Sequence, residues 1–227
     1  MKKTIVISLG GSLIIPDDVN FRYLNEFKKV IMKNSKRFRI VVVCGGGSIA
    51  RKYIKAIEMN RGNVYHQSLS GIAATRMNAR FLSYFFGFDP EWGIPKDMET
   101  LEKYLKKRNL VFCGGLEYKP EQTSDSTAAT IAKALNGEFV NLTDVNGLYD
   151  KDPKKYSDAK LIKKISWKGF DKMAQKIGFK PGQHFVLDQG ASKIIMKHRI
   201  KTFIMRDVKD LENFLEGKSF VGTTIEN

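Results

Sequence analysis

The sequence has no long hydrophobic run. In its 227 residues, no apolar stretch approaches the roughly 20 residues that a membrane-spanning helix requires. The N-terminal stretch MKKTIVISLGGS is basic and then apolar, but its apolar part of about six residues is shorter than the roughly 7–15 of a secretion signal. We therefore expect no membrane partner, interpret this stretch as a first strand, and predict a cytoplasmic protein.

Cysteine and histidine are scarce. Cys44 and Cys113 are the only cysteines; each ends an apolar run and directly precedes glycines, and the three histidines are scattered. The absence of CxxC pairs and clustered histidines argues against a zinc site. A chain of this length does not need a disulfide, so we expect both thiols to be reduced and buried.

Acidic residues are outnumbered by basic ones. The chain has 39 lysines and arginines against 24 aspartates and glutamates, which gives a net charge of +15. This balance favours anionic partners such as nucleotides, phosphorylated metabolites or nucleic acid. Because the lysines are spread along the chain without a dense run, we interpret them as a solvated basic surface. The aromatic residues of FRYLNEFKK recur at helical spacing, so we predict no nucleic-acid partner.

Short apolar runs alternate with amphipathic segments. We expect Phe21, Leu24, Phe27 and Ile31 to share the buried face of the first long helix. Such alternation indicates βαβ units with a mostly parallel sheet, in one α/β domain over residues 1–227. Residues 143–188 are rich in turn signals, and we assign them to a second lobe of the same domain. The predicted strands are 4–9, 39–44, 110–113, 138–142 and 201–205, and the predicted helices are 21–33, 47–59, 69–86, 97–107, 124–135 and 190–199.

Glycines follow three of the predicted strands. They are Gly10-Gly11, Gly45-Gly46-Gly47 and Gly114-Gly115. The carboxyl ends of parallel strands meet at one edge of a sheet, where loops lead into helix N-termini that attract phosphate. Glycine lets the backbone approach a phosphate closely. Three such loops predict a polyphosphate site, although neither GxxxxGK[ST] nor a GxGxxG after a strand is present.

Three polar residues near these loops are candidates for the same site. Arg51 falls one turn into the helix that follows the triple glycine, where it either reaches the phosphates or lies on the surface. Thr123 and Asp125 open an Ala-rich helix. The threonine can cap the helix or bind phosphate, and the aspartate can favour the helix dipole or orient a lysine or a magnesium ion.

The stretch TDVNGLYDKDPKK (143–155) follows a predicted strand. Gly147 comes too early for an EF-hand calcium loop and no terminal glutamate follows. Asn146-Gly147 permits a β-hairpin. The functional alternative is a nucleoside pocket, which would use four residues: Thr143, Asp144, Tyr149 and Asp152.

Taken in order, these motifs resemble the amino-acid-kinase family, and within it the archaeal-type uridylate kinases. The resemblance covers nearly the whole chain, and its long middle motif and its tail are its most specific parts. The matching segments are SLGGS (8–12), GGGSIARKYI (45–54), GIAATRMNA (71–79), GG (114–115), TSDSTAA (123–129), LTDVNGLYDKDPKKYSDAKLIKKI (142–165), LDQGASKII (187–195) and GTTIE (222–226).

The resemblance implies a three-layer αβα sandwich and transfer of a phosphoryl group from ATP to UMP. It implies Mg²⁺ bound through ATP without a direct protein ligand, and a homo-oligomer, typically a hexamer. It also implies an acceptor lobe over about 1–137 and a nucleotide lobe over about 138–227. Such kinases act by positioning and by neutralising charge, so they need no strong base.

The resemblance also assigns roles to residues. Asp125, Lys193 and Arg51 would be catalytic. The UMP side would comprise Gly45, Ser68, Gly114, Gly115 and Thr123. The ATP side would comprise Gly10, Gly11, Gly46, Arg51, Thr143, Asp144, Tyr149 and Asp152.

The chain departs from the family pattern at three places. Ser8 stands where many members carry a lysine, Ser68 stands where uridylate kinases carry an aspartate, and the 114–125 loop is longer than usual. The last two affect the acceptor side, so another small phosphate or carboxylate acceptor stays open. A histidine after the triple glycine, typical of isopentenyl phosphate kinases, is absent. A non-catalytic nucleotide-binding relative is the remaining alternative.

Overall fold

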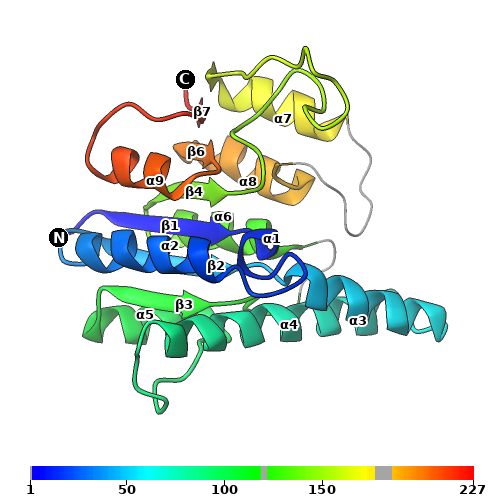
Figure 1. The fold of residues 1–227 in the computed structure, drawn as a ribbon, viewed down its shortest axis with the longest axis vertical. Helices are drawn as coiled ribbons and strands as arrows, with labels where there is room; N and C mark the ends of the chain where they lie inside the picture. The colour runs from blue at the N-terminus through cyan, green and yellow to red at the C-terminus, as the bar shows by residue number, and fades with distance from the viewer. Residues whose placement is uncertain (1, 119–121, 177–185) are drawn as a thin grey trace.

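One seven-stranded sheet organises the chain in the computed structural model, which describes residues 2–118, 122–176 and 186–227 (Figure 1). Its strand order is β3-β2-β1-β4-β6-β7-β5. The strands are β1 (Thr4–Leu9), β2 (Arg39–Cys44), β3 (Leu110–Cys113), β4 (Glu138–Leu142), β5 (Lys164–Ile165), β6 (Thr202–Met205) and β7 (Thr223–Ile225). All pairings among the first five strands in this order are parallel, and β7 runs antiparallel to β6.

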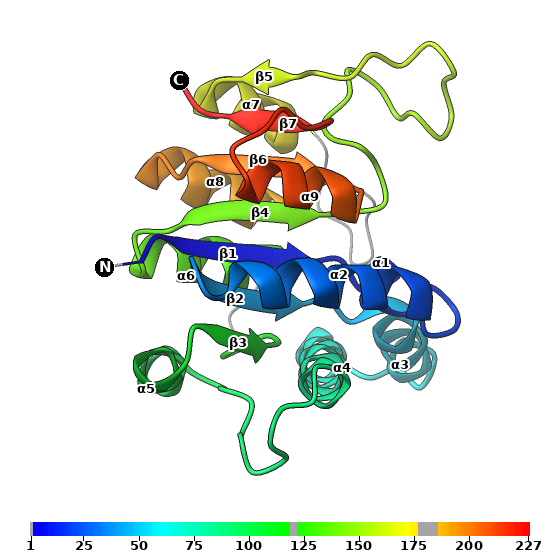
Figure 2. The ribbon, with the colours of Figure 1, turned by 60° about the vertical axis from the view of Figure 1, so that its left-hand side comes forward.

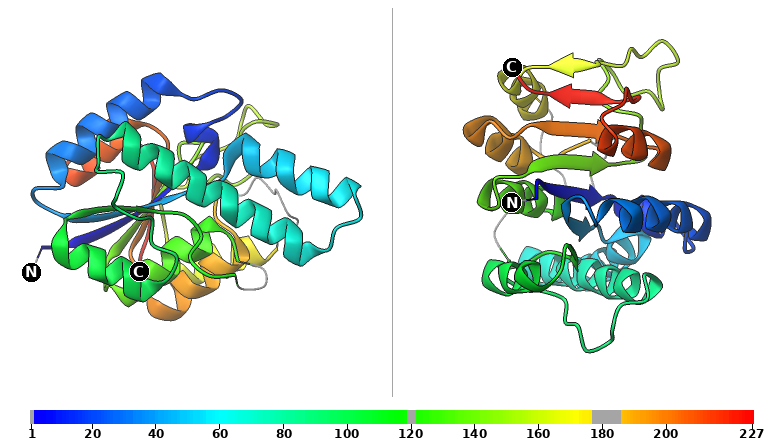
Figure 3. Two further views of the ribbon diagram at one scale, coloured as in Figure 1. Left: turned by 90° about the horizontal axis from the view of Figure 1, so that it is seen from below. Right: turned by 90° about the vertical axis from the view of Figure 1, so that its left-hand side faces the viewer.

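Helices cover both faces of the sheet (Figures 2 and 3). One apolar cluster joins the sheet to α1, α2, α4 and α9, and a second joins its other face to α5, α6, α7 and α8. The predicted three-layer αβα sandwich is therefore confirmed. The helices are α1 (Gly11–Ile14), α2 (Phe21–Asn34), α3 (Gly47–Met59), α4 (Val64–Phe85), α5 (Met98–Lys107), α6 (Ser124–Ala134), α7 (Trp167–Gln175), α8 (Gln189–His198) and α9 (Val208–Leu215).

The predicted elements are present, with two kinds of correction. All five predicted strands form, and all six predicted helices form within a few residues of their expected ends. The sequence analysis missed the short elements α1, β5 and β7, and it also missed α7 and α9. Phe21 was wrongly placed on the buried face of α2: it is 64% exposed, whereas Leu24, Phe27 and Ile31 are buried.

The strand register brings the carboxyl ends of the central strands to one edge. Leu9 of β1 pairs with Cys44 of β2 and with Leu142 of β4, and Cys113 of β3 pairs with Val43. The glycine loops that follow β1, β2 and β3 therefore lie side by side, as predicted. Cys44 and Cys113 are buried and free, and they belong to opposite faces of the sheet.

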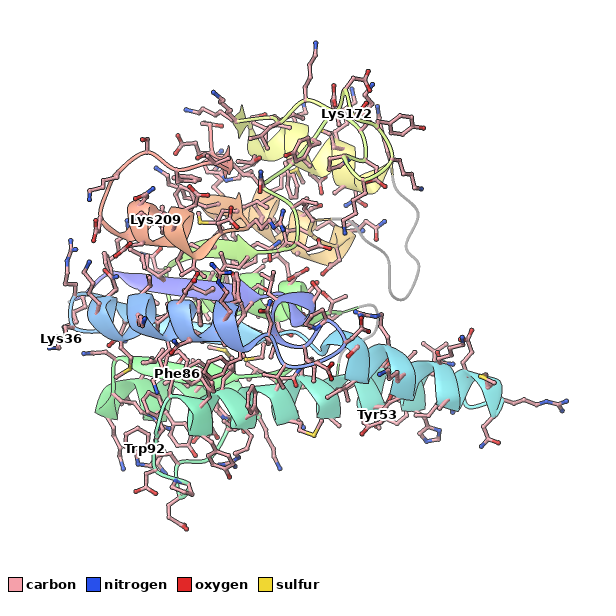
Figure 4. All side chains as sticks on the ribbon, viewed as in Figure 1. Lys36, Tyr53, Phe86, Trp92, Lys172 and Lys209 are labelled. Atoms are coloured by element: carbon pink, nitrogen blue, oxygen red, sulfur yellow. The ribbon has the colours of Figure 1, made fainter. Side chains whose placement is uncertain are left out.

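Basic side chains are spread over the described surface. Lys36, Lys172 and Lys209 lie at the periphery on separate parts of the fold (Figure 4). The helices α3 and α4 extend beyond the body of the sheet, with Tyr53 exposed on α3 (Figures 1 and 4). Within the described residues, no helix is long and apolar enough to cross a membrane.

Candidate active site

Two glycine loops meet at the end of β1 so closely that side chains are excluded. The amide of Gly45 donates to the carbonyl of Leu9 at 2.9 Å. A Cβ on Gly11 would lie 2.0 Å from the backbone nitrogen of Gly47, and Gly47 itself has a φ of +63°. Only glycine combines these conformations with this approach. The loops thus form a bare backbone surface, and Gly46 caps α3 there.

Arg51 follows this surface on α3. Its guanidinium is exposed and donates to the carbonyl of Pro16 at 3.5 Å. The weak contact holds the side chain beside the loop that follows β1 without neutralising its charge. Arg51 therefore lies on the surface and also near the glycine edge, which agrees with both alternatives that the sequence analysis gave for it.

The helix α4 fixes the glycine loops that follow β2 and β3. The buried Asn78 donates to the carbonyl of Gly45 at 2.8 Å, and the hydroxyl of Thr75 accepts the amide of Gly115 at 2.8 Å. Arg76 donates to the carbonyls of Gly115 and Leu116, and burial lowers the pKa of its guanidinium. The sequence analysis gave no separate role to these three residues, because their partners are distant in the sequence.

Ser68 lies on the same helix, seven residues before Thr75. At a rise of about 1.5 Å per residue, it is about 10 Å along α4 from the contact with Gly115. One turn before Ser68, the ring of Tyr65 makes an edge-to-face contact with Tyr118 at 4.7 Å. Residues 116–118 therefore run along α4 toward Ser68. Residues 119–121 of the 114–125 loop lie outside the described residues.

The N-terminus of α6 carries the half-buried Asp125. The hydroxyl of Thr123 caps the helix by accepting the amide of Asp125 at 3.1 Å. The hydroxyl of Ser8, on β1, donates to Oδ1 of Asp125 at 2.6 Å. Burial and the nearby charge of Asp188 raise the pKa of the Asp125 carboxyl to about 7, against the opposing effect of the Ser8 hydrogen bond. This carboxyl group can therefore change its charge near neutral pH.

Asp188 is a site residue that the sequence analysis missed. Its carboxylate caps α8 and also accepts hydrogen bonds from two hydroxyls at the start of α6. An aspartate directly before a helical segment was a visible N-cap signal, but the contact with α6 depends on tertiary structure. Lys193 lies in the second turn of α8 with an exposed side chain, and no contact among the described residues joins it to Asp125.

The segment after β4 begins at the same edge. A Cβ on Gly10 would lie 3.7 Å from the Cα of Thr143, whose hydroxyl approaches Asp144 at 3.5 Å. Asp144 forms an ion pair with Lys154. Oδ1 of Asp152 accepts the amide of Lys154 at 2.9 Å, so part of its carboxylate already stabilises a turn.

No two-residue hairpin forms at Asn146-Gly147. Tyr149 instead forms an antiparallel bridge with Leu161, which closes a long loop. The tail fastens this loop, because the buried hydroxyl of Thr223 accepts the amide of Leu148 at 2.8 Å and donates to the carbonyl of Ile162 at 2.6 Å. The tail motif (222–226) and the long middle motif (142–165) are thus joined by hydrogen bonds.

The structure therefore gathers most of the predicted residues but not all. Backbone contacts and short hydrogen bonds bring together Gly10, Gly11, Gly45, Gly46, Gly114, Gly115, Thr123, Asp125 and Thr143 at or beside the carboxyl edge of β1–β4. Arg51 and Ser68 flank this edge on α3 and α4. No described contact joins Lys193, Tyr149 or Asp152 to it. The arrangement offers glycine amides, two helix N-termini and a titratable acid, which suits two phosphorylated ligands in apposition.

This fold and site define a class of phosphate-binding α/β protein. The chain matches the amino acid kinase family over residues 3–206, and it belongs to that family. The family resemblance and the expected fold are therefore confirmed.

Among the members of this family, the chain is similar to uridylate kinases. It is 37% identical to a uridylate kinase of Thermoplasma volcanium, with 100% of this chain and 99% of the relative covered. It is 34% identical to one of Methanocaldococcus jannaschii, with 98% and 99% covered. The crystal structure of uridylate kinase from Archaeoglobus fulgidus superimposes with a TM-score of 0.84 at 31% identity, over 99% of this chain and 100% of that one.

Proposed function

We propose that this protein transfers the γ-phosphoryl group of ATP to UMP and so forms UDP and ADP. The observation that carries the proposal is the meeting of the glycine loops after β1, β2 and β3 beside a half-buried Asp125. This geometry supports a kinase of a small anion. The acceptor is supported by the names of relatives that match the chain along its full length.

The two substrates take opposite sides of the glycine edge. We assign the acceptor to residues about 1–137 and the donor nucleotide to residues about 138–227 together with the β1 and β2 loops. The UMP side comprises Gly45, Ser68, Gly114, Gly115 and Thr123. The ATP side comprises Gly10, Gly11, Gly46, Arg51, Thr143, Asp144, Tyr149 and Asp152.

The reaction requires little covalent work from the protein. An oxygen of the UMP phosphate forms a bond to the γ-phosphorus while the bond from that phosphorus to the β,γ-bridging oxygen breaks, and ADP leaves with that oxygen. The glycine amides and the α3 and α6 N-termini stabilise the negative charge that spreads over the transferred group. Arg51 and Lys193 add positive charge, and Asp125 in its ionised form orients these cationic groups.

Mg²⁺ is the cofactor of this proposal and is held by the phosphates of ATP. Among the described residues, no three histidine, cysteine, aspartate or glutamate side chains are grouped as a metal cage. Magnesium usually keeps several waters and binds through substrate phosphates, and this donor set fits that mode. We further propose that the enzyme serves pyrimidine nucleotide biosynthesis in the cytoplasm as a homo-oligomer, a hexamer by family resemblance.

The acceptor can be tested directly. ADP release with Mg-ATP should be followed against UMP, CMP, dTMP, isopentenyl phosphate, N-acetylglutamate and no acceptor. We expect turnover with UMP well above the other acceptors. Activity on another acceptor and none on UMP would contradict UMP as the substrate. It would leave the assignment of the ATP site intact and would indicate that Ser68 and the 114–125 loop select a different acceptor. Binding of ATP without any turnover would favour a non-catalytic relative.

A further inference from the structure

One carboxylate joins two helix N-termini that are distant in the sequence. Oδ1 of Asp188 accepts the amide of Ala191 at 2.8 Å and the hydroxyl of Ser126 at 2.7 Å, and Oδ2 accepts the hydroxyl of Thr123. The first contact caps α8, and the other two hold the start of α6. Both oxygens are used, and the side chain of Ser126 is fully buried. This junction lies between the two helices that carry Asp125 and Lys193.

The role of Asp188 exceeds that of an ordinary helix cap. Asp97 caps α5 in the same way, by accepting the amide of Thr100 at 2.7 Å, but its carboxylate contacts no second helix among the described hydrogen bonds. An N-cap side chain stabilises its own helix. Asp188 in addition fixes the position of a neighbouring helix, so its loss should displace groups that lie on two helices.

The junction also sets the electrostatic surroundings of Asp125. From the elements packed against the start of α6, two groups face this carboxyl: the Ser8 hydroxyl from β1 and the Asp188 carboxylate from the start of α8. No lysine or arginine forms an ion pair with Asp125 within residues 2–118, 122–176 and 186–227. Burial raises the pKa of the Asp125 carboxyl most, and the negative charge of Asp188 raises it further.

We propose that Asp188 is a positioning residue that locks the N-terminus of α6 to that of α8 and thereby fixes Asp125 relative to Lys193. The proposal rests on the proposed function, because it concerns residues to which that function assigns roles. The proposed function assigns Asp188 to neither substrate, and its observed contacts are with Thr123, Ser126 and Ala191. It acts through Thr123 and Ser126, whose hydroxyls it holds on one side, and through the cap of α8 on the other.

The test compares Asp188→Asn and Asp188→Ala with the matched caps Asp97→Asn and Asp97→Ala in the full chain. We expect Asp188→Asn to lower kcat with UMP and Mg-ATP about 10–100-fold, because displacement by about 1 Å at a catalytic site has effects of this size. KM should change less than kcat. The acidic limb of the kcat profile should move to lower pH, because the pKa of Asp125 falls when the neighbouring charge is removed. Unchanged kcat and an unchanged limb would overturn the proposal.

Ser126→Ala provides a second variant that keeps both the charge of Asp188 and the cap of α8. It should lower kcat less than Asp188→Asn does, and it should leave the acidic limb in place. If Asp188 were a structural cap alone, Ser126→Ala would leave kcat unchanged, and the Asp188 variants would lose stability as the Asp97 variants do.

Amide hydrogen exchange separates this proposal from the proposed function. Exchange should become faster in both 124–131 and 189–196 in Asp188→Ala, whereas Asp97→Ala should affect 98–107 alone. If the wild-type protein releases no ADP with UMP, the proposed function fails and the exchange result still decides whether the junction exists. Faster exchange confined to 189–196 would overturn the junction whatever the acceptor.

Discussion

The hydroxyl of Ser8 donates a 2.6 Å hydrogen bond to Oδ1 of Asp125, which joins the end of β1 to the start of α6. The family resemblance gives a lysine at the position of Ser8 in many members. Here a neutral donor contacts the acid instead, so it stabilises the ionised carboxylate without compensating its charge. The site therefore keeps an acid whose pKa is raised to about 7.

Removal of this hydroxyl should raise the pKa of Asp125 further. In Ser8→Ala, we expect the acidic limb of the kcat profile to move to higher pH by about one to two units, because a hydrogen bond to a charged group contributes about 1.5–3 kcal/mol. Ser8→Thr retains the hydroxyl and serves as the control. Steady-state rates between pH 5 and 9 measure both. If the acidic limb of the kcat profile lies at the same pH in the wild type, Ser8→Ala and Ser8→Thr, this role of Ser8 is contradicted.

Asp125 should reduce stability at alkaline pH. Its folded pKa of about 7 lies above the ordinary value of 3.8, so the folded state binds more protons than the unfolded state between these values. The free energy of unfolding contributed by this group therefore falls as pH rises from about 4 through 7. Asp125→Asn removes the effect and should be more stable than the wild type at pH 8, by up to about 4 kcal/mol because each pKa unit corresponds to about 1.4 kcal/mol, and equally stable near pH 4.

Urea unfolding at the two pH values, followed by circular dichroism, measures this difference. The same variant should lose most of its kinase activity, since the amide cannot replace the ionised carboxylate. A variant that is less stable than the wild type at pH 8 would show that the Ser8–Asp125 contact outweighs the cost of the buried charge.

Lys193 provides a test of the role that we propose for α8. Lys193→Ala should lower kcat about 100-fold or more if the side chain reaches the transferred phosphoryl group, since such charge stabilisation is among the largest catalytic effects. Lys197, one turn further on α8, is also exposed and makes a matched control. Rates and melting temperatures of both variants should be compared. Equal effects of the two substitutions would remove Lys193 from the mechanism.

Thr223 should hold in place the 143–162 segment, which we assign to the binding of ATP. Thr223→Val removes one accepted and one donated hydrogen bond at a buried site, and we expect a loss of about 1–3 kcal/mol of stability. KM for ATP should rise more than KM for UMP, because the freed segment lies on the donor side. Thr224→Val, at the next and less buried position, is the control. An equal rise in both KM values would argue against this assignment.

The sequence predicted the fold where its patterns were strong. Buried runs such as 39–44 and 110–113 predicted strands correctly because strands covered on both faces are almost continuously apolar. The strands β5 and β7 have only two and three residues, too few for any periodicity. The helices α7 and α9 did carry signals: Ser166 caps α7, and Val208, Leu211 and Leu215 are spaced as one buried face.

The positions of the site glycines could be predicted from the sequence, whereas the hydrogen bonds between distant segments could not. A glycine directly after a strand needs only the order of elements to be placed at a sheet edge. The contacts of Asn78 with Gly45 and of Asp188 with Thr123 join residues 33 and 65 positions apart, so their meaning depends on the packed helices. The exposure of Phe21 has the same origin, because the buried face of a helix is set by what packs against it.

The most direct test of the central claim is ³¹P NMR of the purified protein with UMP, ATP and Mg²⁺. The account predicts that the UMP and ATP signals fall together while the two doublets of UDP rise in step with ADP, and that omission of the protein abolishes the change. ADP accompanied by inorganic phosphate, with UMP unchanged, would contradict transfer to UMP and reduce the activity to ATP hydrolysis.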